Sequence, residues 1–518
     1  MGQGLSTAIN PPPLTLQHCL LDGVIDVGRY TYYRRRCDYA NEFVENHRRS
    51  ALKKRKLCKI ETNVTKKRKA QRSVKRHGIF VRDDDDSLRE IRPTDTLWYM
   101  LYVVQAPANA RLHRLFRTRF RMPYDNFISL SHEVKAHSSF RRWTRCDAVG
   151  EKPSNVKLLL LGCMQYIGRA WTLDDVSEAN GISVNTNRDF ILCFIEYGST
   201  VLYKRWVLDT NLNTDVKVQE SVFKLAGFDG CIGSSDGTHI PMLKCAQWAS
   251  NLHKGFKLNV PARTYNVTVD HSRRILGSTS GHPGTWNDKT LILFDDFISS
   301  VHKGKRYKDY EFKLYEKDIN GTVHQIVYKG VWFMVDNGYL SWSCTVPPGT
   351  DGTTYELIRF SEWLESMRKD VECTFGIMKG RFCLLRYGLR FQSIEKCDQL
   401  WLTCCALHNM LLYEDGLDTN WEEGVKSNWE ISHNNDTQKV SPYAISRLNR
   451  SFVSNNMGDM NTNDYVGSHI SVQCQKYTVN NKRVVQKMPL HLFKRCLINH
   501  FDIRFKRNDI VWPSRCKK

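Results

Sequence analysis

The spacing of apolar residues along the chain changes near residue 226. Between residues 94 and 225 apolar side chains recur every three or four positions, which is the period of an amphipathic helix. From residue 228 onward short β-branched runs, bounded by turn residues, alternate with further helical stretches. The pattern predicts an all-α region that is followed by a region of strands and helices.

The all-α region begins with several short helices. Residues 156–167 are mostly apolar and follow Ser154, so they predict a buried helix. Ahead of them, apolar residues between 94 and 140 have helical spacing. We expect these side chains to pack together with Arg and Lys outside: Leu97, Met100, Leu101, Val104, Leu112, Leu115 and Phe116.

Two further helices follow with clear start signals. Thr172 and Asp175 have the spacing of a capping box and begin the first helix. Gly181 makes the turn, and Ser183 caps the second helix, which runs to about Tyr197. This order is typical of a helix-turn-helix, whose second helix would lie in the major groove of DNA. The residues predicted to contact DNA there are Asn185, Thr186, Asn187 and Arg188.

A helical hairpin that only packs against its neighbours is the alternative interpretation of these two helices. The charge of the chain helps to choose between them. The formal net charge is +22, which indicates a polyanionic partner, most simply nucleic acid. We therefore favour DNA contact.

The second region begins with an apolar run at residues 228–232 that leads to Asp236 at the predicted end of a strand. Asp236 followed by Gly237 is also a common turn pair, so this Asp alone decides nothing. Residues 263–269 and 274–280 flank a polar turn and predict an antiparallel hairpin beside the first strand.

The rest of this region supplies further acids at element ends. Asp288 begins a helix that continues to about Ile298. Residues 312–328 predict an inserted hairpin that turns at Asn320-Gly321. Residues 331–335 then predict a buried strand that ends in Asp336.

A helix over residues 360–378 completes the set. Arg368, Glu372 and Lys379 share one face of it because they are four and seven residues apart. Cys404, Cys405 and His408 lie on a later apolar helix, where core packing is favoured over a nucleophile or a metal pair.

Strand, hairpin, helix, strand and helix form the order in which an RNase H-like sheet is built. In that order Asp236, Asp336 and Glu372 would meet at one end. Three carboxylates around one point repel each other unless cations neutralise them. Two Mg²⁺ or Mn²⁺ ions would fit, one activating water or a 3′-hydroxyl and the other stabilising the leaving oxygen. The charge and the acids together predict a protein that cuts and rejoins double-stranded DNA.

Several features indicate the compartment. Basic clusters within residues 34–76 have the spacing of a bipartite nuclear import signal, and a disordered phosphate-binding arm is the other interpretation. Both predict a nuclear protein. The 17 Cys are scattered with no signal peptide before them, which favours reduced thiols. Gly2 lies in a myristoylation pattern, but the pattern is short and one acyl chain would anchor the protein only marginally. The longest apolar run, residues 158–164, is too short to span a bilayer, so no membrane partner is expected.

The ordered motifs resemble the DDE transposases of the PIF/Harbinger superfamily. The likeness extends from about Arg119 to Leu412 and is strongest to the branch of plant transposon proteins, through residues 168–175 and Tyr203. The similar segments are residues 233–240, 281–288, 335–339, 371–382 and 404–409.

This resemblance implies metal-binding acids at Asp236, Asp288, Asp336 and Glu372, with Asp288 as an accessory to the other three. A helix N-cap is the alternative role for Asp288. Candidate phosphate contacts, which could instead be solvated helix charges, are Arg368, Lys379 and Arg381. The resemblance also implies a Myb-like DNA-binding partner, and we expect a homo-oligomer on DNA.

The expected fold class is α/β, with an RNase H-like mixed sheet preceded by an all-α helix-turn-helix domain. We expect a basic, largely disordered arm over 1–92, a helical domain over 93–225, a nuclease domain over 226–415, a polar disordered linker over 416–470 and a basic appendage over 471–518.

Three functions are compatible with these features. The first is a Mg²⁺-dependent transposase that acts at terminal inverted repeats. The second is a domesticated protein that binds DNA or a Myb-like partner without cutting, as a regulator or scaffold. Retention of all four acids disfavours it, because a binding protein does not need them. The third is an RNase H-like repair nuclease. The helix-turn-helix is the one sequence feature that distinguishes the transposase from it.

Overall fold

The computed structural model describes residues 80–82, 88–90, 92–146, 154–209, 215–255, 257–349, 354–417, 473–477 and 483–511. The predicted myristoylation site at Gly2, the basic clusters of the arm and nearly all of the polar linker lie outside the described residues. Before the helical region, β1 (Phe80–Arg82) and β2 (Leu88–Glu90) pair antiparallel. Within the described part of the chain, no helix is both long and apolar enough to cross a membrane.

The helical region is built around one buried helix, α5 (Val156–Arg169), which Asn155 caps in place of the predicted Ser154. Among the helices that contact it, four α-helices belong to the same region: α3 (Ala110–Phe120), α4 (Tyr124–Ala136), α6 (Leu173–Asn180) and α7 (Val184–Tyr197). Shorter helical segments are Pro93–Asp95, Tyr99–Gln105, Ala106–Ala108, Ser138–Trp143, Gly198–Leu202 and Lys204–Asp209, and α9 (Val216–Leu225) leads to the sheet.

The first helical segment buries a different face from the predicted one. Leu97, Met100 and Val104 are exposed, whereas Trp98 and Tyr102 are buried. Tyr102 packs edge-on against two phenylalanine rings of α3. Aromatic rings bury more apolar area than leucine or valine, so they occupy the inward face. Both faces have helical spacing, and the spacing alone could not distinguish them.

The helices α6 and α7 begin and end as predicted. Thr172 and Asp175 exchange two hydrogen bonds, of 2.8 and 3.1 Å, in a capping box at the start of α6. Gly181 adopts a left-handed φ of 66° and ends α6. Ser183 then accepts a hydrogen bond from the Thr186 N–H and caps α7. The local start and stop signals therefore determine these two helices.

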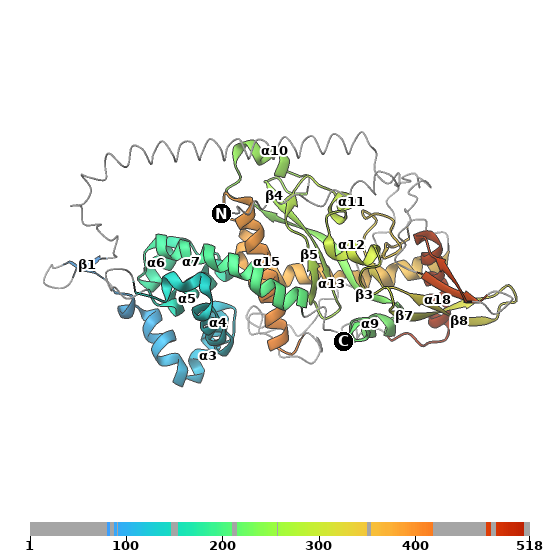
Figure 1. The fold of residues 1–518 in the computed structure, drawn as a ribbon, viewed down its shortest axis with the longest axis horizontal. Helices are drawn as coiled ribbons and strands as arrows, with labels where there is room; N and C mark the ends of the chain where they lie inside the picture. Colours follow the sequence, from blue (N-terminus) through green and yellow to red (C-terminus); the bar gives the residue numbers. More distant parts are fainter. Residues whose placement is uncertain are drawn as a thin grey trace, which may run out of the picture. The chain divides into compact units, whose positions relative to one another are not determined.

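A mixed sheet of six strands lies at the centre of the second region (Figure 1). Its main order is β10–β9–β3–β4–β5, in which β3 pairs antiparallel with β4 and parallel with β9. The pair β4–β5 is antiparallel and the pair β9–β10 is parallel, so the predicted hairpin beside the first strand is confirmed. The strands are β3 (Cys231–Pro241), β4 (Ala262–Val269), β5 (Ile275–Ser278), β6 (His282–Pro283, paired with β4), β9 (Trp332–Met334) and β10 (Thr345–Val346). The fold is mixed α/β, as the sequence predicted.

The helix predicted after Asp288 is divided into two, α11 (Asp288–Ile292) and α12 (Asp296–His302). The cause is Asp295, whose carboxylate accepts a hydrogen bond from the Ile298 N–H at 2.8 Å and caps a new helix. A short side-chain acceptor favours such an N-cap over a helix interior.

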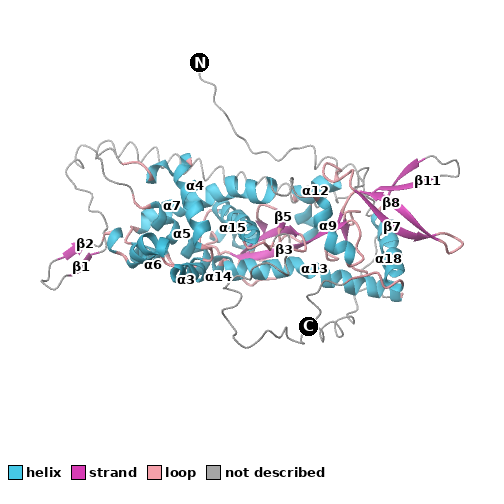
Figure 2. Cartoon of the chain, turned by 90° about the horizontal axis from the view of Figure 1, so that it is seen from below, coloured by secondary structure: helices cyan, strands magenta, loops and turns pink. Residues whose placement is uncertain are grey.

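Three helices follow the last strand: α13 (Tyr355–Arg381), α14 (Cys383–Tyr387) and α15 (Ile394–Glu414). Asp236 of β3 contacts Arg368 of α13, whereas the next residue, Gly237, faces Asp288 of α11. Successive residues of a strand point to opposite faces, so α13 and α11 cover opposite faces of β3. Figure 2 shows α12 and α13 on opposite sides of the sheet.

The inserted hairpin is formed by β7 (Glu311–Lys317) and β8 (Val323–Lys329). Its loop has three residues between Asp318 and Thr322, whose backbones are hydrogen-bonded, so the predicted two-residue turn is wrong. Gly321 has a φ of 81°. It supplies the left-handed residue of a three-residue hairpin loop.

The described part of residues 471–518 is an integral part of the fold. Its strands β11 (Gln473–Tyr477) and β12 (Arg483–Lys487) extend the inserted hairpin into a sheet of order β12–β11–β8–β7. The helix α18 (Leu490–Lys506) contacts β7 and α13, and its Phe493 and Phe501 lie in a core with Trp332 of β9 (Figure 2). Long-range pairing of this kind has no signal in local composition.

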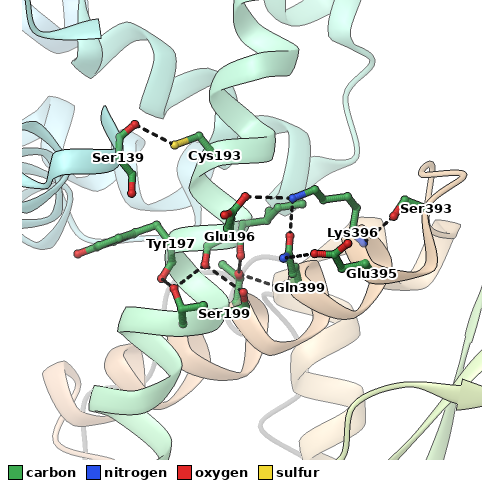
Figure 3. A network of polar contacts seen from close by, with 12 residues as sticks. Ser139, Cys193, Glu196, Tyr197, Ser199, Ser393, Glu395, Lys396 and Gln399 are labelled. Atoms are coloured by element: carbon green, nitrogen blue, oxygen red, sulfur yellow. Dashed lines mark hydrogen bonds and ion pairs between the residues drawn. The ribbon is translucent and has the colours of Figure 1, made fainter. Parts of the chain in front are cut away.

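The helical region and the sheet share one hydrophobic core. That core contains residues of α5 and α7 together with residues of β4 and α15. On its surface, Lys396 of α15 binds Glu196 of α7 at 3.2 Å and Gln399 at 2.8 Å (Figure 3). Packing therefore continues across the predicted boundary at residue 225.

Candidate active site

The sequence predicted Asp236 at the end of a strand, but in the structure it lies within β3. The strand continues to Pro241 because β4 pairs with it along Ser234–Pro241. The parallel partner β9, in contrast, pairs with β3 only as far as Ser234. Asp236 therefore lies two residues beyond the end of the parallel ladder. At this position β3 is paired with β4 on one side and is no longer paired with β9 on the other.

Asp336 reaches the same edge from β9. It follows the last paired residue of β9, Met334, by two positions, and its Oδ1 accepts a hydrogen bond from the Gly338 N–H at 2.8 Å. A Cβ placed on Gly338 would lie 3.0 Å from Asp336 Oδ1 and 3.0 Å from Asp288 Oδ2. The two carboxylate oxygens are therefore within twice that distance of each other, and a side chain at Gly338 would crowd both.

Asp288 is a member of this acidic group and not a helix cap. Asn287 caps α11 by accepting a hydrogen bond from the Thr290 N–H at 3.0 Å, which leaves the neighbouring Asp288 carboxylate for other contacts. Its Oδ1 also lies 2.9 Å from the Cβ position of Gly237 on β3. The N-cap alternative for Asp288 is wrong, because the preceding Asn performs that role.

Glu372 is connected to Asp236 through an arginine. Arg368 Nη2 lies 3.1 Å from Glu372 Oε1, one helical turn along α13, and its Nη1 lies 3.4 Å from Asp236 Oδ2. The Glu372 side chain is 49% exposed, whereas those of Arg368 and Asp236 are 16% and 17% exposed. The guanidinium thus lies between two of the predicted acids.

The electrostatics of this group are those of crowded acids. Burial, and to a smaller extent the charges of Asp336 and Asp288, raise the pKa of Asp236 to about 6, against the lowering effects of Arg368 and of the Gly237 N–H. Burial also raises the pKa of Asp288; the charge of Asp336 adds to this increase, and Lys257 and Arg368 oppose it. We call Asp236, Asp288, Asp336 and Glu372 the acid site.

A hydrogen-bond network that the sequence did not reveal supports the acid site from behind. The Tyr339 hydroxyl donates to Asn266 Oδ1 on β4, and the Asn266 amide donates to Ser235 at 3.2 Å and to Asp295 at 2.7 Å. Burial, together with the charges of the three aspartates, raises the pKa of Tyr339, so it stays a donor. The available signal was Asn266 itself, because a buried amide in a strand needs partners.

Two lysines lie near the same edge. Lys379 Nζ donates to the His239 carbonyl at 3.5 Å, and burial lowers the pKa of that ammonium group. Burial and the charges of Lys257 and Lys379 lower the pKa of His239 to about 4, so the imidazole is neutral at physiological pH. Sequence reasoning predicted Lys379 as a phosphate contact and missed Lys257, which is exposed in an irregular loop.

Arg381 is not placed to contact phosphate. Its side chain is 1% exposed, and its Nη1 lies 3.5 Å from His408 Nδ1 in the interior. Cys404, Cys405 and His408 are also fully buried, in agreement with their predicted packing role. The end of α13 turns into the protein between the sheet and α15, so the last basic residue of the predicted set is enclosed.

The residues predicted to contact DNA on α7 divide into two groups. Asn185 and Arg188 are exposed and are joined by a hydrogen bond of 2.7 Å, and Thr186 is partly exposed. Asn187 is 1% exposed and donates to the Ile182 carbonyl at 2.8 Å, so it cannot reach a DNA groove. Its side-chain amide stabilises the turn between α6 and α7. The sequence pattern did not predict this structural role.

The donor set of the acid site fits hard cations, because carboxylate oxygens are the ligands that Mg²⁺ and Mn²⁺ prefer. Among the described residues, however, no three His, Cys, Asp or Glu side chains are close enough together to hold one ion. Glu372, the acid that α13 supplies, is paired with Arg368, a cation of the protein itself.

Comparison with known proteins gives one family match. Residues 203–420 match the family of plant transposon proteins, a segment that includes the whole central sheet, the acid site and α15. No curated protein and no solved structure matches the chain. The segment that contains the acid site is thus similar to transposon-encoded proteins.

Proposed function

We propose that this protein is a DDE-type transposase of the PIF/Harbinger kind, a metal-dependent endonuclease that cuts and joins DNA at transposon ends. The observation that supports it most is the convergence of Asp236, Asp288 and Asp336 from β3, α11 and the end of β9. These residues are far apart in sequence, and the mutual repulsion of their carboxylates makes the assembly costly unless cations neutralise them. Such an assembly is typical of a functional site.

The order and polarity of the strands support an RNase H-like fold for this segment. Three antiparallel strands, β5–β4–β3, are followed across the sheet by two parallel ones, β9 and β10. The helix α13 follows the last strand and supplies Glu372. This is the arrangement in which the first strand, the fourth strand and a later helix present acids at one edge.

Asp236, Asp336 and Glu372 would hold the divalent ions, with Asp288 beside them. Such ions lower the pKa of a bound water and stabilise the charge on the leaving oxygen. The residues of the chain position this chemistry: the Gly237 and Gly338 N–H groups orient the two aspartates, at 2.8 Å each. Lys379 and the exposed Lys257 would bind the phosphate backbone at the same edge.

DNA binding and assembly belong to the same proposal. The net charge of +22, the exposed Asn185 and Arg188 and the partly exposed Thr186 on α7 support a helix-turn-helix that contacts duplex DNA. The basic arm supports nuclear localisation. A Myb-like partner and a homo-oligomer on DNA follow from the resemblance.

A non-cutting DNA-binding regulator is the second candidate, and one observation favours it. Glu372 is bound to Arg368, and within the described residues no three potential ligands are assembled. A protein that only binds DNA would tolerate that arrangement permanently.

A cleavage assay distinguishes the two candidates. The full chain is incubated with DNA that contains the sequences flanking its gene, with Mg²⁺ or with EDTA. We expect Mg²⁺-dependent nicks at the element ends, and a loss of at least about 1,000-fold for Asp236→Asn or Glu372→Gln with DNA binding retained. The matched control is Glu362→Gln, an exposed acid elsewhere on α13, which should cut normally. Wild-type protein that binds this DNA but never nicks it would support the regulator.

A further inference from the structure

Arg368 has an unusual position for a structural arginine. It contacts Asp236 and Glu372, two acids of the site, from the same guanidinium. Its Nε is buried and has no hydrogen-bond partner among the described residues. By comparison, Arg504 of α18 donates to the Asp229 carboxylate and to the Lys224 and Asp509 carbonyls. The Arg368 guanidinium is therefore held by charge more than by a complete set of acceptors.

The two contacts of Arg368 differ in how easily they can open. Glu372 is half exposed and only one helical turn away, and such a helix-surface pair contributes little to stability. Asp236 is mostly buried, and its distance of 3.4 Å is long for a charged hydrogen bond. Rotation of the long Arg368 side chain would free both carboxylates without moving the backbone.

We propose that Arg368 is an internal counter-cation of the acid site, which a divalent metal ion must displace from Glu372. In the metal-free protein its charge partly neutralises the crowded carboxylates. When a metal ion takes over that role, its charge repels the nearby guanidinium, and the guanidinium leaves Glu372. Arg368 therefore sets the metal concentration at which the acid site assembles. This inference rests on the proposed nuclease function.

The position of Arg368 also suggests where the side chain goes. It lies on the face of α13 that contains Lys379, one further residue near the edge of β3. A guanidinium released there would be available to a phosphate group with the geometry that arginine favours. The same residue would then link metal binding to engagement of the DNA backbone.

The test measures metal binding in the absence of DNA and of catalysis. Free Mn²⁺ is counted by electron paramagnetic resonance during titration of the full chain and its variants. For Arg368→Gln we expect Mn²⁺ to bind about three- to tenfold more tightly than in wild type, because a competing charge is removed. Glu372→Gln should weaken binding in both backgrounds. The matched control is Arg359→Gln, at another position on α13. It removes an ion pair with Asp502 of α18 and should leave Mn²⁺ affinity unchanged.

The outcomes separate this inference from the proposed function. If wild type binds Mn²⁺ through Glu372 and Arg368→Gln binds it no more tightly, the counter-cation role is overturned and the nuclease proposal stands. If wild type binds no Mn²⁺, both fail. Should Arg368→Gln not fold, Arg368→Lys provides the test. Its single ammonium cannot bridge both carboxylates, so a gain of about twofold or more is expected, and unchanged affinity rejects the inference.

Discussion

Two clusters of acids and cations in this protein use the same residue types in opposite ways. In one, which we call the Asp229 clamp, the buried carboxylate of Asp229 accepts from His500 and Arg504, both at 2.8 Å. Burial raises its pKa, but these two partners outweigh burial and the pKa is lowered. In the acid site burial raises the pKa of Asp236 to about 6, because Arg368, which Asp236 shares with Glu372, does not offset burial and the charges of Asp336 and Asp288.

The difference separates a cluster that stabilises the fold from a candidate functional cluster. The Asp229 clamp joins the β3 side of the sheet to α18 and satisfies its charges, so it stabilises the fold. The acid site leaves negative charge incompletely matched, which costs stability and is retained where an external cation can supply the balance. Both clusters are mostly buried, so burial alone would not separate them.

The largest effect should come from breaking the clamp. Asp229→Ala leaves the buried His500 and the mostly buried Arg504 without their shared carboxylate, and we expect a loss of about 3–5 kcal/mol in the free energy of unfolding. Urea denaturation of the full chain measures it. Asp509→Ala is the control, since its exposed carboxylate lies 3.7 Å from Arg504, and it should change stability by less than about 0.5 kcal/mol. Equal effects of the two variants would remove the distinction.

The acid site should respond in the opposite direction. Because the pKa of Asp236 is raised, ionisation of this carboxyl group is less favourable in the folded protein than in the unfolded chain. Ionisation therefore lowers the free energy of unfolding. The contribution of Asp236 to stability is therefore complete below about pH 4 and is lost as the pH rises through about 6. We expect Asp236→Asn to stabilise the fold by about 1–3 kcal/mol at pH 7.5 and hardly at all at pH 4. Urea midpoints at both values decide; a variant that is less stable at pH 7.5 would contradict the comparison.

The smallest effect should come from Arg188 of α7, where the same contrast separates two neighbouring residues. Arg188→Gln removes an exposed charge, so we expect DNA affinity to fall a few-fold and the slope of log K against log[salt] to decrease by about one, with stability unchanged. Asn187→Ala should instead cost about 1–3 kcal/mol of stability, because buried partners lose their hydrogen bonds. Fluorescence anisotropy over a salt series and urea denaturation measure the two. An Arg188 variant with unaltered salt dependence would exclude α7 from the DNA interface.

Sequence reasoning succeeded where the cause was local. The caps at Thr172 and Ser183, the antiparallel hairpin after β3 and the strand before Asp336 all follow from side chains within a few residues. It also selected four acids, of which Asp288 and Asp336 meet at Gly338, while the charges of both act on Asp236. It failed where a distant partner decided: Asp236 lies within a longer strand because β4 pairs with it, and Arg381 is buried because α15 covers it.

The sequence by itself determined the helix starts, the alternation of strands and helices, the positive charge and the identity of the acids, because these depend on residue type and near neighbours. Only the tertiary structure decided that Arg368 lies between Asp236 and Glu372, that Asn287 and not Asp288 caps α11, and that α18 packs into the core around Trp332. Each of those outcomes depends on which surfaces meet after folding, and side chains far apart in the chain compete for the same partner only then.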